Sequence, residues 1–199
     1  NGNSTTLGAN TLKSIYYHPG NNHLYIGTHL GGMYVFDCGT GKGHSLHHVE
    51  GDATSLPHEI VNDIQPYKDG LAVLTQGGPA FFNLQTEKFS PIVDDVKLQL
   101  NWEYSFETFF IDNKQRAWLA YSAGGLLCVD FVNKTAKRYS SSSSNPSAIG
   151  KFKIVKIFQS SRGDIYFCTI GSGLFKYIEA DDSFKSYNSS DGCLPSDYC

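Results

Sequence analysis

The chain has 199 residues, of which 40% are hydrophobic and 18% charged, so it can bury the core of one or two domains. The formal net charge is only −3, which lacks the strong positive charge of a nucleic-acid-binding protein, and we expect no nucleic acid partner. No apolar run approaches the ~18 residues of a spanning helix. Aromatic residues (14%) and 20 glycines, without a long helix-forming run, favour short strands and exclude an all-helical domain.

Five cysteines are scattered along the chain without a Cys-x-x-Cys pair or the spacing of a zinc finger. Cys128 and Cys168 lie inside strand-like apolar runs, where a small buried hydrophobe is the usual role. We therefore expect neither a metal site nor a cofactor.

A repeat of two apolar strands joined by a glycine turn occurs four times. Its second glycine falls at Gly32, Gly78, Gly125 and Gly173, at intervals of 46, 47 and 48 residues. Glycine suits a tight turn that needs positive φ or a close approach of neighbouring backbone, so these four positions are interpreted as structural. Thr28, Thr75 and Thr169 precede the turn, where a hydroxyl can bond to the turn backbone.

Another apolar strand precedes each copy and a more polar strand follows it, which makes a four-stranded antiparallel meander. A period of ~47 residues is typical of a propeller blade. The fold class is therefore predicted as all-β, a single partial β-propeller domain over 1–199. We expect blades at about 7–52, 53–98, 99–146 and 147–191, and the start of a fifth at about 192–199.

The repeat resembles that of the two-component regulator propeller family. The resemblance rests on Leu24–Thr28 (Leu-Tyr-Ile-Gly-Thr) with Gly31–Met33, and on Leu56-Pro57 ahead of Val61–Ile64. Three aromatic residues fill the family's aromatic position: Tyr25, Trp118 and Tyr166. Trp118 and Tyr166 are expected to be structural, packing on adjacent blades with little solvent exposure. The second blade departs from the pattern at Ala72 and Pro79.

The resemblance implies the periplasmic sensor region of a hybrid two-component system of gut Bacteroidetes. Members of that family carry two seven-bladed propellers outside the membrane and a histidine kinase beyond it, and their known ligands are glycan fragments. An oligosaccharide ligand, the remaining blades and a membrane-attached kinase are thus the partners that it implies. Two alternatives stay open, a protein–protein interaction propeller and, less favoured, a propeller lyase or glycosidase.

No enzyme motif is present, and this region is expected to be non-catalytic. The His44, His47 and His48 group is interpreted as exposed strand or loop histidines, and Asp94 and Asp95 as solvated charge. Ligands of propellers usually meet the face formed by the turns between second and third strands and by the loops between blades. On that face we place five candidate ligand-binding residues: His29, Gln76, Trp102, Tyr104 and Tyr121.

The last residues repeat an earlier motif, because Leu194–Tyr198 restates Leu56–Ile60. Four blades of a larger ring would expose an apolar flank at each end. We expect these flanks around Leu12–Tyr17 and Tyr25 in the first blade and around Phe167 and Phe175 in the last. The sequence therefore predicts that the chain forms a homodimer.

Overall fold

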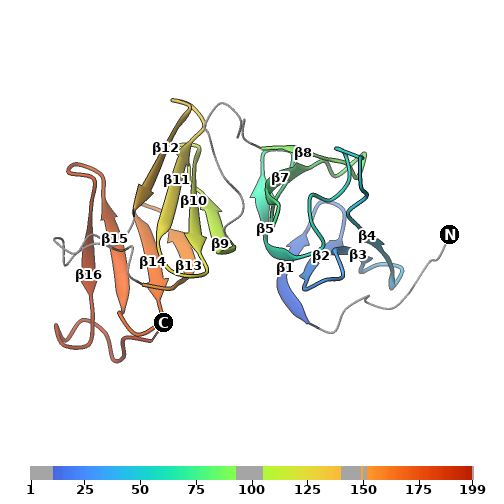
Figure 1. Ribbon diagram of the computed structural model, residues 1–199. Coiled ribbons are helices and arrows are strands. Elements are labelled where there is room, and N and C mark those ends of the chain that lie inside the picture. Colours follow the sequence, from blue (N-terminus) through green and yellow to red (C-terminus); the bar gives the residue numbers. More distant parts are fainter. Residues whose placement is uncertain (1–10, 93–104, 140–148, 150–151, 199) are drawn as a thin grey trace. The chain divides into compact units, whose positions relative to one another are not determined.

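The computed structural model (Figure 1) describes residues 11–92, 105–139, 149 and 152–198, and these form sixteen strands in four antiparallel sheets. Each sheet is a meander of four strands consecutive in sequence, and the described residues contain no α-helix. The predicted all-β fold of four-stranded blades is thereby confirmed. The chain divides into two compact units, Asn1–Glu103 and Tyr104–Cys199, which are described separately.

The N-terminal unit holds blades 1 and 2. Blade 1 consists of β1 (Leu12–His18), β2 (His23–Thr28), β3 (Met33–Asp37) and β4 (Lys42–Leu46). Blade 2 consists of β5 (Val61–Tyr67), β6 (Gly70–Thr75), β7 (Gly78–Phe82) and β8 (Phe89–Pro91).

The C-terminal unit holds blades 3 and 4. Blade 3 consists of β9 (Phe106–Ile111), β10 (Arg116–Tyr121), β11 (Leu126–Asp130) and β12 (Thr135–Tyr139). Blade 4 consists of β13 (Ile154–Gln159), β14 (Ile165–Thr169), β15 (Leu174–Ile178) and β16 (Ser183–Tyr187).

Strand register makes the blades directly comparable. Counting back from the glycine turn, Tyr25 of blade 1, Trp118 of blade 3 and Tyr166 of blade 4 occupy one position, opposite Val35, Cys128 and Lys176 respectively. We call the sheet face that carries this position the forward face and the other the back face. Cross-strand partners share a face, so the register assigns every strand residue to one or the other.

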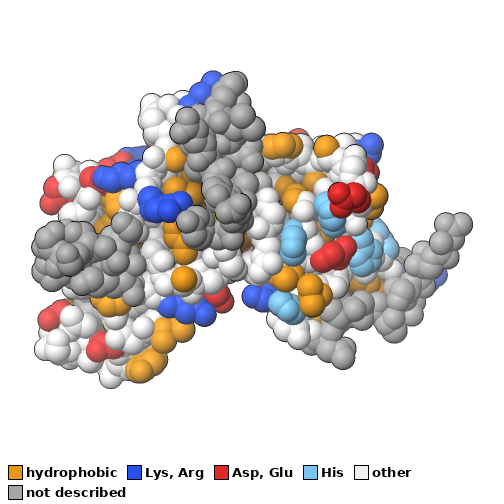
Figure 2. Space-filling view, in the orientation of Figure 1, with side chains coloured by type: hydrophobic (Ala, Val, Ile, Leu, Met, Phe, Trp, Pro, Cys, Tyr) orange, Lys and Arg blue, Asp and Glu red, His pale blue; other side chains and the backbone are white. Residues whose placement is uncertain are grey.

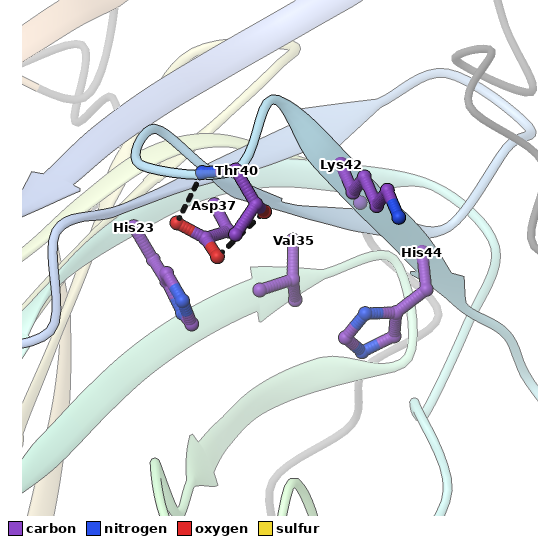
Figure 3. A pocket seen from close by; sticks show the side chains of 7 residues that line it. His23, Val35, Asp37, Thr40, Lys42 and His44 are labelled. Atoms are coloured by element: carbon purple, nitrogen blue, oxygen red, sulfur yellow. Dashed lines mark hydrogen bonds between the residues drawn. The ribbon is translucent and has the colours of Figure 1, made fainter.

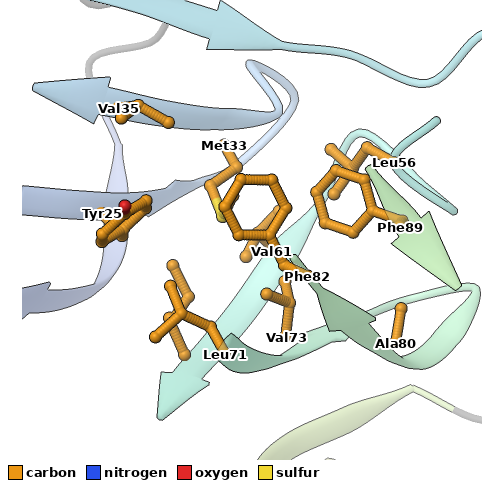
Figure 4. Close-up of a cluster of buried hydrophobic side chains, with 11 residues drawn as sticks. Tyr25, Met33, Val35, Leu56, Val61, Leu71, Val73, Ala80, Phe82 and Phe89 are labelled. Atoms are coloured by element: carbon orange, nitrogen blue, oxygen red, sulfur yellow. The ribbon is translucent and has the colours of Figure 1, made fainter. Parts of the chain in front are cut away.

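The core of the N-terminal unit lies between the forward face of blade 1 and the back face of blade 2. Tyr25, Met33 and Val35 are at most 2% exposed and pack against a layer from blade 2 (Figure 4). In that layer Phe82 meets the Tyr25 ring edge-on at 5.9 Å and the Phe89 ring at 4.9 Å. Apolar packing of one sheet on the next therefore holds this pair of blades together.

The C-terminal unit uses the same faces. Trp118, on the forward face of blade 3, is fully buried, with its ring centroid 5.5 Å from Phe167 and 4.8 Å from Tyr177 on the back face of blade 4. Its indole N–H donates to Asp112 Oδ2 at 2.9 Å, which satisfies its one polar atom inside the core.

The glycine turns close in the same way in different blades. Thr28 Oγ1 donates to the Gly32 carbonyl at 2.8 Å, and Thr169 Oγ1 donates to the Gly173 carbonyl at 2.7 Å. Gly32 and Gly173 have φ of 69° and 75°, and a Cβ on either would lie 2.2 Å from a backbone carbonyl oxygen. Both positive φ and close approach therefore require glycine at these two turns.

A backbone hydrogen bond, which we call the interlock, also joins the turn glycine to a segment further along the chain. Gly32 N–H donates to the Glu59 carbonyl at 3.0 Å, and in the repeat Gly173 N–H donates to the Asp197 carbonyl at 2.9 Å. The acidic side chains also act alike, since Glu59 accepts from His48 N–H at 2.9 Å and Asp197 from Ser189 N–H at 2.5 Å. The segment Leu194–Tyr198, which repeats the motif Leu56–Ile60, thus forms the same hydrogen bonds as the segment that precedes blade 2.

The predicted flanks are exposed only in part, with Leu12, Ile15 and Tyr17 of the first blade at 50%, 63% and 48% exposure. Tyr25, Phe167 and Phe175 are 1%, 0% and 2% exposed, so the prediction that they lie on exposed flanks is wrong. They face the neighbouring blade inside their own unit. Tyr166 is half-buried rather than buried, although its counterpart Trp118 is fully covered by blade 4.

Candidate ligand-binding site

The predicted ligand residues fall in different surroundings. His29 is exposed and Gln76 half-buried, and they follow β2 and β6 at equivalent turns of blades 1 and 2. Tyr121 is 7% exposed, with its ring stacked on Phe106 at 4.7 Å, so most of its surface is already covered by protein. Trp102 and Tyr104 lie outside the described residues.

A hollow with a volume of ≈ 490 Å³ opens at the outer part of blade 1. Its lining comes from β2, β3, β4 and the β3–β4 turn: His23, Val35, Asp37, Thr40, Lys42, Gly43 and His44. A volume in the range of about 300–1,000 Å³ is usual for small-molecule sites. None of the residues predicted to bind a ligand lines it.

Register explains why these side chains converge. His23 pairs with Asp37, Val35 with His44, and Asp37 with Lys42, so all of them project from the forward face of blade 1. Figure 3 shows the two imidazoles on either side of Val35, which forms an apolar floor between polar groups. The hollow is therefore the outer continuation of the face that packs on blade 2.

The corresponding place in the C-terminal unit is filled by larger side chains. Arg116 stands where blade 1 has His23, Trp118 where it has Tyr25, and Tyr139 where it has Leu46. There the Arg116 guanidinium lies 5.2 Å from the Trp118 ring and bonds to Asp112 at 2.7 Å. Of these three positions only that of His23 lines the hollow, so Arg116 is the one of the three larger side chains that occupies the equivalent space in blade 3.

The imidazole–carboxylate contact beside the hollow has a repeat counterpart. His44 Nε2 lies 2.9 Å from Glu87 Oε2, which links β4 to the β7–β8 turn of blade 2. In the C-terminal unit the same positions hold Lys137 and Asp182, which form an ion pair. An imidazole thus replaces an ammonium group at the edge of the hollow.

The acidic group of the hollow is kept ionised by its own turn. Asp37 accepts from the Thr40 hydroxyl at 2.7 Å and from Gly39 N–H at 2.8 Å, and these bonds lower the pKa of its carboxyl. Inside the junction, burial raises the pKa of Tyr25, although Asn21 donates to its hydroxyl at 2.7 Å. At neutral pH the hollow therefore offers the Asp37 carboxylate and the Thr40 hydroxyl oxygen as acceptors and the Lys42 ammonium group as a donor.

All seven histidines of the chain lie between His18 and His58. Figure 2 shows histidine side chains gathered with acidic ones on the face in view of this part of the molecule. His47 Nδ1 lies 3.1 Å from Glu59 Oε2, so it belongs to the interlock before blade 2. His44 lies in strand β4, as the interpretation of exposed strand or loop histidines allows, but it is half-buried and lines the hollow.

A second, smaller hollow of ≈ 250 Å³ lies nearer the turn that carries Gln76. It is lined mainly by backbone and small or apolar side chains, with polar groups at His48, Asp52, Ser55 and Ser90. Its volume lies below the usual range for small-molecule sites, and we therefore regard the larger hollow as the candidate site.

The described residues were also searched for clusters of metal-ligating side chains, and among the cysteines Cys128 is buried whereas Cys38 and Cys193 are exposed. No group of three or more metal-ligating side chains is found among these residues. Burial raises the pKa of the Cys128 thiol to about 12, which keeps it protonated at neutral pH. Helices long and apolar enough to cross a membrane are likewise absent from the described ranges.

Comparisons with known proteins place the chain among β-propellers. The extracellular domain of a proposed hybrid two component system, BT3049 from B. thetaiotaomicron, matches with a TM-score of 0.74 and 20% identity over 94% of this chain. PorZ, a surface component of the type-IX secretion system of Porphyromonas gingivalis, matches with a TM-score of 0.67 and 14% identity over 100% of it. The β-propeller domain of Myceliophteria thermophila Cps50 (Swd1) matches with a TM-score of 0.51 and 10% identity over 84%.

The chain spans 25% of the BT3049 domain, 30% of PorZ and 51% of the Cps50 propeller. No protein-family model and no curated protein matches the sequence. At these identities the likeness shows the fold alone, and the four sheets are the blades of a β-propeller.

Proposed function

We propose that the chain is a ligand-sensing module on the extracytoplasmic, periplasmic side of a hybrid two-component sensor, and that its ligand is a glycan fragment. The observation that carries this proposal is the hollow of blade 1, which combines polar and apolar side chains and has His23 where blade 3 has the larger Arg116. The likeness to the extracellular BT3049 domain supports it. In this proposal the module is non-catalytic, and the output comes from a histidine kinase elsewhere in the protein.

The chemistry of the hollow suits a sugar. Asp37 and the Thr40 hydroxyl oxygen can accept hydrogen bonds, Lys42 can donate them, and Val35 is the apolar residue of the lining. A sugar ring has hydroxyl groups around its edge and less polar C–H faces, so it can use both parts of the lining. Binding would transmit a signal if the ligand favoured one of two conformations of the module.

The test is calorimetric titration of the chain with a panel of monosaccharides and oligosaccharide fragments. A ligand that occupies the hollow should lose at least about tenfold in affinity with Lys42→Ala, since a hydrogen bond to a charged donor is worth about 1.5–3 kcal/mol. Lys134→Ala, an exposed lysine of blade 3, is the matched control and should leave affinity unchanged.

Two results would contradict the proposal. One is absence of binding across the panel, which would favour a protein-interaction propeller. The other is binding that neither Lys42→Ala nor Thr40→Ala alters, which would place the sugar elsewhere.

A further inference from the structure

The turn between the third and fourth strands of each blade holds one residue in the left-handed backbone region. Gly41 has this position in blade 1, with φ of 68°. The equivalent residues of blades 2, 3 and 4 are Glu87, Lys134 and Asp182, with φ of 53°, 54° and 51°. Glycine adopts a positive φ without strain, whereas a residue with a side chain does so less readily. The turn by itself therefore does not explain why blade 2 has a glutamate there.

Glu87 acts on the hollow of blade 1 through His44. Its Oε2 atom lies 2.9 Å from Nε2 of His44, which lines the hollow from β4. A carboxylate can only accept a hydrogen bond, so Nε2 of the neutral imidazole must carry the proton and Nδ1 is the acceptor nitrogen. Nδ1 has no hydrogen-bond partner among the residues that the structure describes. Figure 3 shows the His44 ring on the same side as Val35, so this acceptor belongs to the lining that a ligand would meet.

The other polar groups of the hollow are also mainly acceptors. The Thr40 hydroxyl donates its proton to Asp37 Oδ2 at 2.7 Å, which leaves the oxygen atoms of both side chains as acceptors for a ligand. Lys42 can only donate, and the His23 ring can take either role. A ligand with several hydroxyl groups can donate to these acceptors, because each hydroxyl carries a proton.

Charge in and beside the hollow disfavours an anionic ligand. The lining holds one carboxylate, Asp37, and one ammonium group, Lys42, whose charges cancel. Glu87 adds a second carboxylate at the edge of the hollow. A carboxylate or sulfate group on a ligand would therefore meet two carboxylates against one ammonium group, and it has no proton to donate to the acceptors.

We propose that Glu87 of blade 2 is a positioning residue of this site and that the hollow selects neutral sugars. Glu87 holds the proton of His44 on Nε2, so that Nδ1 accepts a hydrogen bond from a sugar hydroxyl. The inference rests on the proposed function, because it concerns the ligand of the same hollow. It adds the class of glycan fragment, one without carboxylate or sulfate groups, and a contribution of blade 2 to the site.

The first test needs no ligand. Long-range proton–nitrogen correlation NMR of histidine-labelled protein at about pH 8, where an ordinary imidazole is neutral, shows which ring nitrogen carries the proton. His44 of the wild type should be protonated at Nε2, and Glu87→Gln should keep this form because its amide oxygen can still accept. Glu87→Ala should show a fraction protonated at Nδ1. A wild-type His44 protonated mainly at Nδ1 would overturn the proposal.

The second test compares the affinities of neutral sugars with those of their uronate counterparts, glucose with glucuronate and galactose with galacturonate, as single sugars and as oligosaccharides. The neutral form should bind at least about tenfold more tightly. Glu87→Ala should lower its affinity by about threefold to tenfold, as expected for one hydrogen bond, and Glu87→Gln should restore most of this loss. Lys134→Ala, at the same turn position of blade 3, is the matched control and should leave the affinity unchanged.

The outcomes separate this inference from the proposed function. Tighter binding of the uronates, or wild-type affinity in Glu87→Ala, would overturn the inference and leave a sugar site in the hollow intact. Absence of binding in both the neutral and the acidic series would contradict the proposed function, and the inferred selectivity would fail with it. Circular dichroism of each variant verifies that its fold is retained.

Discussion

Trp118 is a central packing residue of the C-terminal unit. It is fully buried, it packs on Phe167 and Tyr177 of blade 4, and its indole N–H is bonded to Asp112. Trp118→Ala should therefore lower the free energy of unfolding by about 3–5 kcal/mol. Tyr166→Ala, at the same repeat position but half-buried, is the control and should cost about 1 kcal/mol. Urea unfolding followed by circular dichroism measures both, and equal losses would contradict this account.

Comparing Gly32 with Gly41 distinguishes the cost of a positive φ from the cost of a steric clash. Gly32 and Gly41 have nearly the same φ, 69° and 68°, but a Cβ would lie 2.2 Å from the Leu46 carbonyl oxygen at Gly32 and in open space at Gly41. Gly41→Ala should cost about 1 kcal/mol for the left-handed backbone alone. Gly32→Ala should cost at least about 3 kcal/mol, because backbone must also move. Similar unfolding midpoints for the two variants would show that close approach at the turn is unimportant.

At the scale of elements, charge reinforces the junction of blades 3 and 4. Glu179, after β15, bonds to Lys114 at 2.5 Å and to Arg116 at 2.9 Å, and its pKa is lowered from 4.5 chiefly by the hydrogen bond from Lys114. Burial by itself would lower the pKa of Arg116, but its bond to Asp112 and the charges of Asp112 and Glu179 raise it. Both groups therefore stay charged at neutral pH.

The lowered pKa of Glu179 predicts a pH dependence. A carboxyl with a depressed folded pKa stabilises the fold above its unfolded pKa, and that contribution is lost as pH falls through the folded value. Glu179→Gln should therefore lower the urea midpoint most at about pH 6–7 and progressively less below about pH 4.5. Glu50→Gln, whose side chain is fully exposed, should show little effect at either pH. An unchanged difference between wild type and Glu179→Gln down to about pH 3 would contradict the assignment.

The number and order of strands could be predicted because the glycine turn repeats in register with apolar runs on both sides. The direction in which each side chain points could not. Inner strands of a propeller are apolar on both faces, so Tyr25 and Ile26 look alike in sequence, and no alternation distinguishes the forward from the back face. For this reason the sequence pattern predicts exposed flanks at Tyr25, Phe167 and Phe175, although the three side chains are buried.

The candidate site was harder to predict than the strands. The lining residues come from three strands and a turn, and the match of His23 with the larger Arg116 of blade 3 can be seen only once the register of the strands is known. The aromatic residues chosen as ligand contacts illustrate the limit, since Tyr121 is used for packing on Phe106.

At the scale of the whole molecule, the chain consists of repeated blades, and we propose that the hollow beside blade 1 is the ligand site. The N-terminal unit alone contains the hollow, the imidazole–carboxylate pair of His44 and Glu87, and every histidine of the chain. A function located there predicts that a ligand perturbs these groups and leaves the filled junction of blades 3 and 4 unchanged.

The most direct test is NMR of the seven imidazole rings in histidine-labelled protein during titration with the best ligand from the sugar panel. The account predicts that His23 and His44, which line the hollow, shift with a common dissociation constant. His18 and His58, outside the lining, serve as internal controls and should stay in place. Shifts confined to His29, or a bound ligand that moves neither His23 nor His44, would contradict the assignment of the hollow as the sensing site.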